Sequence, residues 1–196
     1  ASTTGLPESV DLRSRFNPIR SQGQQGSCVA FALTSIYEYT INRKTNELLD
    51  LSEAFLYYNA RDIDPNDDVN INTDKGSRSN CAIKSLSDFG LPLESMCPYN
   101  DQVYNQRPSD EAYEEAKKRL LIKALNVVRK SEVFKAALAE GYPIQGGFLL
   151  CESFFAKASL DGYVPMPTES ELSAAINPAE GEMRRHGRHE MAIVGY

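Results

Sequence analysis

The stretch Gln22-Gly23-Gln24-Gln25-Gly26-Ser27-Cys28-Val29-Ala30-Phe31 carries the strongest indication of fold in this chain. Its glycines let the backbone turn tightly, and the residues after Ser27 continue without Gly or Pro past Arg43. We therefore expect a helix over 27–43, with Ser27 near its N-cap and Cys28 on its first turn. The unpaired N–H groups and the dipole at a helix start favour a thiolate over a thiol. Cys28 is therefore a candidate nucleophile.

Gln22 precedes Cys28 by six residues, across the glycine-containing loop. A side-chain amide placed there can donate to a developing oxyanion, together with the backbone N–H of Cys28. The alternative is a buried structural cysteine after a tight turn, because cysteine is among the most buried residue types.

A second motif, His189-Glu190-Met191-Ala192-Ile193-Val194-Gly195-Tyr196, lies at the other end of the chain. A histidine at the head of an apolar strand can face a cleft while the strand is buried on its other face. The alternative is a structural histidine. The chain has only two histidines, so a Cys–His mechanism has to use one of them, and His189 is the better placed.

The order of the expected elements indicates an α+β protein of two lobes. Ser52 is expected to cap the second helix, and Gly90 suits a left-handed stop after the third. Residues 62–79 are polar and read as a loop. The further helices are expected over 52–60, 80–89, 109–120 and 131–140, and the strands over 121–128, 144–150 and 191–196.

Composition narrows the possible functions. The net charge of −6 and the lack of a Lys/Arg block disfavour nucleic acid as a partner, and no apolar run approaches the ~18 residues of a membrane span. The four cysteines allow at most one disulfide if Cys28 is a nucleophile, which slightly favours a reducing compartment. A zinc site at His186 and His189 would lack a second pair of ligands, and Asp62–Asp68 lacks the order of a calcium loop. We therefore expect no metal.

Together the motifs resemble the papain family of cysteine peptidases, in a divergent microbial or viral form. The resemblance rests on Gly26-Ser27-Cys28 with Gln22 before it, on the His189 motif, on the opening Leu6-Pro7-Glu8-Ser9-Val10-Asp11-Leu12-Arg13 and on Pro98-Tyr99. It implies a papain-like two-lobed fold with the active site in a cleft between the lobes. The helical lobe would comprise residues 14–105, and the β-barrel-like lobe residues 1–13 and 106–196.

The resemblance also implies a mechanism for hydrolysing peptide bonds without a cofactor. Cys28 would form a thioester with a peptide or protein substrate, His189 would act as general acid and base, and Gln22 would complete the oxyanion hole. Gly76 and Ser77 would present backbone groups to the substrate, where the family commonly has Asn-Gly-Gly. The alternatives are a catalytically inactive peptide-binding or protein-binding module and a Cys–His acyltransferase.

Two departures from the family pattern accompany the resemblance. Gln25 stands where a disulfide-forming cysteine is common, and Val29 stands where an aromatic residue is usual. The orienting Asn of the family follows the histidine by more residues than the seven found here after His189. We therefore expect a C-terminal segment or a second chain to supply that Asn.

Overall fold

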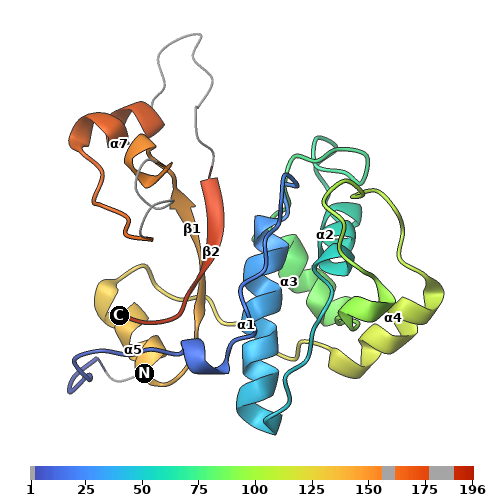
Figure 1. The fold of residues 1–196 in the computed structure, drawn as a ribbon, viewed down its shortest axis with the longest axis horizontal. Helices are drawn as coiled ribbons and strands as arrows, with labels where there is room; N and C mark the ends of the chain where they lie inside the picture. The colour runs from blue at the N-terminus through green and yellow to red at the C-terminus, as the bar shows by residue number, and fades with distance from the viewer. Residues whose placement is uncertain (1–2, 156–161, 177–187) are drawn as a thin grey trace. The chain divides into compact units, whose positions relative to one another are not determined.

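The computed structural model describes residues 3–155, 162–176 and 188–196 (Figure 1). They form two compact units, one of residues 1–146 with 191–196 and one of residues 147–190. The lobe boundaries expected from the sequence stay a prediction. The helices are α1 (Cys28–Thr45), α2 (Glu53–Asp62), α3 (Ser79–Asp88), α4 (Asp110–Ala116), α5 (Ser131–Ala139) and α7 (Glu169–Ile176), and the strands are β1 (Ile144–Leu149) and β2 (Arg188–Ile193). None of the helices in the described ranges is long and apolar enough to cross a membrane.

Local capping chemistry explains where several helices begin and end. The Ser52 hydroxyl accepts a hydrogen bond from the Phe55 N–H at 3.0 Å and caps α2, as predicted. The Ser109 hydroxyl does the same for α4 through Ala112. Gly90 has a φ of 78° directly after the last turn of α3. A β-carbon on Gly90 would lie 2.0 Å from the carbonyl oxygen of Ala116, so only glycine fits there.

The helix predictions are confirmed, with two differences. Ser27 is the N-cap residue of α1, but its hydroxyl makes no capping hydrogen bond. The helix expected over 109–120 is α-helical only to Ala116 and continues as a 3-10 turn over Lys117–Arg119.

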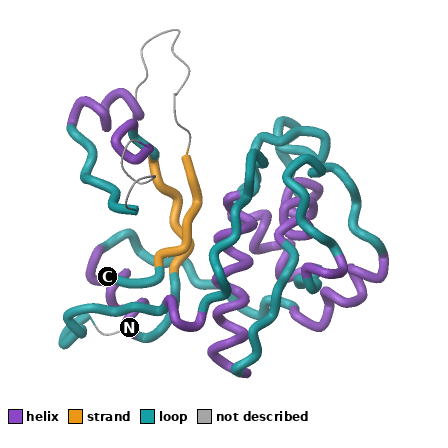
Figure 2. Tube along the Cα trace, in the orientation of Figure 1, coloured by secondary structure: helices purple, strands orange, loops and turns teal. Residues whose placement is uncertain are grey.

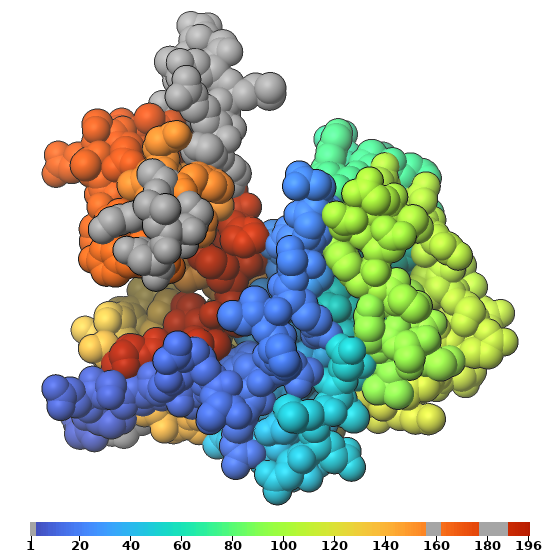
Figure 3. All heavy atoms as spheres, viewed as in Figure 1, coloured from blue at the N-terminus to red at the C-terminus, as the bar shows by residue number. Residues whose placement is uncertain are grey.

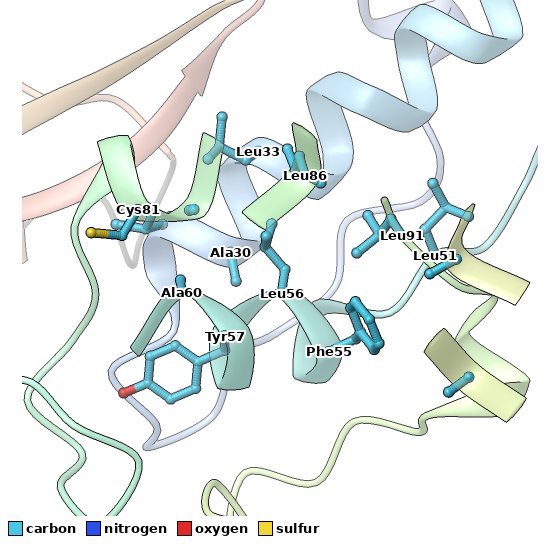
Figure 4. Close-up of a cluster of buried hydrophobic side chains, with 14 residues drawn as sticks. Ala30, Leu33, Leu51, Phe55, Leu56, Tyr57, Ala60, Cys81, Leu86 and Leu91 are labelled. Carbon is cyan, nitrogen blue, oxygen red and sulfur yellow. The ribbon is translucent and has the colours of Figure 1, made fainter. Parts of the chain in front are cut away.

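The hydrophobic core of the first unit lies among α1, α2 and α3 (Figure 4). Ala30 and Leu33 of α1, Leu56 of α2 and Leu86 of α3 point toward one another there. Each fully buried leucine stabilises the fold by about 1.5–3 kcal/mol. Since Val29 and Ala30 are buried, this packing fixes the first turn of α1 and with it the position of Cys28.

The two strands form a two-stranded sheet, and the chain beyond β2 pairs with the N-terminal segment. Val10 and Tyr196 exchange backbone hydrogen bonds of 2.9 and 3.0 Å, and the Leu12 N–H donates to Val194 at 2.9 Å. The strand predicted over 144–150 is confirmed. The one predicted over 191–196 is β2 as far as Ile193, and Gly195 after it forms an antiparallel bridge with Asp11.

The strand predicted over 121–128 is wrong. These residues form a loop between α4 and α5 (Figure 2). A strand needs a neighbouring strand for its backbone groups, and no described segment pairs with this one as a strand. Ile122 is 98% exposed and Leu125 is 75% exposed, so the apolar composition that suggested a strand is not buried here.

Arg20, in the chain before Cys28, faces three carboxyl groups, and those of Glu38 on α1 and Glu53 on α2 are buried. One terminal nitrogen of the Arg20 guanidinium lies 2.8 Å from a carboxylate oxygen of Glu38 and 2.7 Å from one of Glu53. The contact with Glu53 is an ion pair without hydrogen-bond geometry. The other terminal nitrogen pairs with Asp50. Burial raises the pKa of Glu53 to about 8, although Arg20 opposes the shift. Burial also raises the pKa of Glu38.

The contribution of Glu53 to the free energy of unfolding should fall between about pH 5 and about pH 9. Its folded pKa of about 8 lies above the ordinary value. The stabilisation is therefore complete below the ordinary carboxyl pKa and is lost as the pH rises through 8. Glu53→Gln should reduce this fall in thermal unfolding curves, whereas Glu111→Gln, at an exposed position on α4, should not. Coincident profiles for wild type and Glu53→Gln would contradict the assignment.

Candidate active site

Cys28 is the first residue of the 18-residue helix α1. Its side chain is partly exposed, whereas Gln25 and Ser27 just before it are buried. The first N–H groups of a helix have no partner within the helix, and its dipole is positive at that end. This position favours the anionic form of a thiol. None of the four cysteines, all of which lie in the described ranges, is in a disulfide.

Tyr99 fixes the lead-in segment, which we define as residues 22–27. Its hydroxyl lies 2.7 Å from the Ser27 hydroxyl and donates to the Gln22 carbonyl at 2.8 Å. Burial raises the pKa of Tyr99 to about 12, so the hydroxyl keeps its proton. In Figure 3, the blue surface of the chain before α1 lies against the yellow-green surface of the chain near residue 100. The Ser27 side chain thus bonds Tyr99 instead of capping α1.

The Gln22 amide folds back onto its own segment. Its nitrogen donates to the Gln25 carbonyl at 2.8 Å, and that carbonyl also accepts from the Ser27 N–H at 2.8 Å. A side-chain amide nitrogen carries two N–H donors, and this bond uses one of them. These two bonds fold the loop from Gln22 to Ser27, directly before Cys28.

Gly76 lies beside the lead-in segment. A β-carbon added to Gly26 would lie 3.0 Å from the Gly76 backbone nitrogen, so the two backbones pack closely. The Ser77 hydroxyl is buried and has no hydrogen-bond partner among the described atoms. The substrate-binding roles of Gly76 and Ser77 stay predictions.

His189 lies on β2 and is partly buried. Burial lowers its pKa, and the neighbouring Glu190 carboxylate opposes this shift. The neutral imidazole, which is the form that accepts a proton, is therefore favoured. His189 and Cys28 belong to different compact units, and their pairing stays a prediction, as does the Asn expected to orient His189.

His186, the second residue of the zinc alternative, lies outside the described residues. Within the described ranges, no three His, Cys, Asp or Glu side chains are grouped as metal ligands. In the loop that raised the calcium alternative, Asp64 instead bonds Arg78 through both carboxylate oxygens.

The profile of the papain family of cysteine proteases matches residues 6–196. The chain therefore belongs to the papain family of cysteine proteases. An uncharacterized peptidase C1-like protein of Acanthamoeba polyphaga mimivirus is 31% identical in an alignment of 185 residues that covers 89% of this chain and 54% of that protein. Cysteine proteinase 3 of Entamoeba histolytica is 37% identical over 100 residues, or 50% of this chain and 30% of that protein. The chain spans about half the length of the first relative and less of the second.

Solved structures confirm the papain-like α+β fold. Xylellain, a cysteine protease from Xylella fastidiosa, has a TM-score of 0.80 and 28% identity, covering 99% of this chain and 71% of that one. Digestive procathepsin L 3 of Tenebrio molitor larval midgut has a TM-score of 0.72 and covers 100% of this chain and 57% of that one. At its 20% identity, the second likeness shows the fold alone.

Sequence reasoning missed the side chains and carbonyls that hold the lead-in segment. The Gln24 N–H donates to Asp101 at 3.2 Å, the Gln25 amide to the Asn100 carbonyl at 3.3 Å, and the Gly26 N–H to Asp74 at 2.9 Å. These partners lie 48 to 77 residues away in sequence. The sequence around these partners carries no pattern that indicates the contacts. Asp74 in particular reads as a solvated residue of a polar loop.

We expect iodoacetamide at about pH 5–6 to label Cys28 before the other three cysteines. Cys81 and Cys151 are buried, and burial raises the pKa of Cys81 and of Cys97, so both keep their protons. Peptide mapping by mass spectrometry would locate the label, with Cys28→Ser as the control. Earlier labelling of any other cysteine would exclude Cys28 as the reactive thiol.

Proposed function

We propose that this chain carries the catalytic machinery of a cysteine peptidase that hydrolyses peptide bonds, with Cys28 as the nucleophile. The supporting observation is the position of Cys28 as the first residue of α1, behind a lead-in segment whose buried residues are held by hydrogen bonds. Membership of the papain family supports the reaction class. Xylellain is described as a cysteine protease.

In the proposed mechanism, His189 takes the proton of the Cys28 thiol, and the resulting thiolate attacks the carbonyl carbon of the scissile bond. The resulting oxyanion accepts hydrogen bonds from the Cys28 N–H and the Gln22 amide. Collapse of the intermediate breaks the C–N bond, and His189 gives its proton to the departing amine. His189 then takes a proton from water, and the hydroxide attacks the thioester carbonyl. The C–S bond breaks, the acid leaves, and His189 returns the proton to the Cys28 thiolate. Gly76 and Ser77 would align the substrate through their backbone groups.

The roles of His189 and of an orienting Asn rest on the sequence motif and the family. The Asn would come from a segment outside residues 1–196 or from a second chain, and its amide oxygen would accept from the imidazole. The assay should therefore use the full-length protein. An inactive binding module would bind peptides without cleaving them, and an acyltransferase would give a transfer product with an added amine.

Cys28→Ser and His189→Ala should each lower turnover of a fluorogenic peptide amide by at least about 10³-fold, because each removes a group that makes or breaks bonds. Product analysis by mass spectrometry would distinguish hydrolysis from acyl transfer. Cys151→Ser is the matched control, since it removes a buried thiol at a site with no proposed role. Full activity of Cys28→Ser would refute the proposal.

Gln22→Ala should lower kcat by roughly 10- to 10³-fold, because one oxyanion donor is usually worth about 2–4 kcal/mol in the transition state. KM should change less, since the donor acts mainly on the developing charge. Gln24→Ala, at an exposed position in the same segment, is the control. An unchanged kcat in Gln22→Ala would remove Gln22 from the oxyanion hole.

A further inference from the structure

One peptide group in the lead-in segment, between Gln25 and Gly26, is held from both ends. Its carbonyl accepts from the Gln22 amide at 2.8 Å and from the Ser27 N–H at 2.8 Å. Its N–H belongs to Gly26 and donates to a carboxylate oxygen of Asp74 at 2.9 Å. The orientation of this group therefore sets where the Gln22 amide rests.

Asp74 is itself fixed by a buried side chain of α2. The same carboxylate oxygen that accepts from Gly26 also accepts from the Tyr57 hydroxyl. The Tyr57 ring is 1% exposed, and in Figure 4 its hydroxyl points away from the hydrophobic cluster. Although the Asp74 side chain is exposed, one of its carboxylate oxygens is thus held by the hydroxyl of a buried tyrosine of the first unit.

The backbone just before Asp74 is also anchored, by Arg61 of α2. Its guanidinium donates to the carbonyls of Thr73 at 2.9 Å and Ile71 at 3.3 Å, and also to the Tyr104 carbonyl. Arg61 is 1% exposed and stands 3.9 Å from the centre of the Tyr57 ring. Arg61 therefore fixes the backbone of the loop that carries Asp74, and with it the position of Asp74 beside the lead-in segment.

We propose that Asp74 is a positioning residue, which orients the peptide group between Gln25 and Gly26 and, through it, the Gln22 amide. This inference rests on the proposed peptidase function of the same site. Asp74 touches no reacting atom. Its effect on the reaction comes from holding the Gln22 amide, whose misplacement by even about 1 Å can lower the rate of catalysis strongly.

The test compares Asp74→Ala with Asp74→Asn in the full-length protein, using a fluorogenic peptide amide. Asp74→Ala should lower kcat by about tenfold and leave KM within about twofold, because a misplaced Gln22 amide affects mainly the transition state. Asp74→Asn keeps an oxygen that accepts from Gly26 and Tyr57, so it should stay within about threefold of wild type. Asp67→Ala removes an exposed carboxylate from the same loop and should have no effect.

A double-mutant cycle separates positioning from a general loss of structure. If Asp74 acts through Gln22, Asp74→Ala should lower kcat by less than about twofold in a Gln22→Ala background. Tyr57→Phe, which keeps the ring and removes one partner of Asp74, should cause an intermediate loss. Thermal unfolding midpoints would confirm that the variants are folded.

The outcomes distinguish this inference from the proposed function. If wild type cleaves peptides but Asp74→Ala matches Asp67→Ala, the inference is wrong and the peptidase proposal stands. Fully additive losses in the cycle, or a loss in Asp74→Asn equal to that in Asp74→Ala, would also overturn it. If wild type shows no cleavage and Cys28 is not selectively alkylated, the proposed function and this inference fall together.

Discussion

The buried guanidinium of Arg61 is the constraint on which the surroundings of Cys28 depend. A charged group taken out of water has to be satisfied by the protein, or it costs several kcal/mol. Arg61 meets this requirement with backbone carbonyls from residues 70–73 and from Tyr104, and with the faces of two tyrosine rings. Two loops must therefore come to α2, and the first of them brings Asp74 to the lead-in segment.

The first unit could be predicted from the sequence wherever the determining chemistry is local. Ser52 and Ser109 mark helix starts by a hydrogen bond that spans three residues, and Gly90 marks a stop by its own backbone conformation. The strand prediction for 121–128 failed because a strand forms only where a second segment pairs with it, and the local sequence shows only one of the two. The Ser27 side chain does not cap α1 because its hydroxyl is bonded to Tyr99, which lies 72 residues away in sequence.

The residues of the candidate site also fall into those that the local sequence predicts and those that it does not. The glycines, Cys28 and Gln22 lie within seven residues of one another and could be found by their spacing. The groups that support them come from three other parts of the chain, namely Tyr57 on α2, Asp74 in the loop before α3 and the segment from Tyr99 to Asp101. These partners are close to one another only in the packed tertiary structure, although they lie far apart in sequence. A polar network of this kind is specific because each member satisfies another.

Gln25 stands where the papain-like pattern commonly has a disulfide-forming cysteine, and it is a buried amide that bonds a backbone carbonyl. Noncovalent bonds therefore connect the lead-in segment to the loops around it, and the described cysteines form no disulfide. A thiol reagent that reverses sulfenic acid formation at a reactive cysteine meets no cross-link in these residues that it could cleave. Reducing an oxidised Cys28 would therefore break no disulfide among the described residues around it.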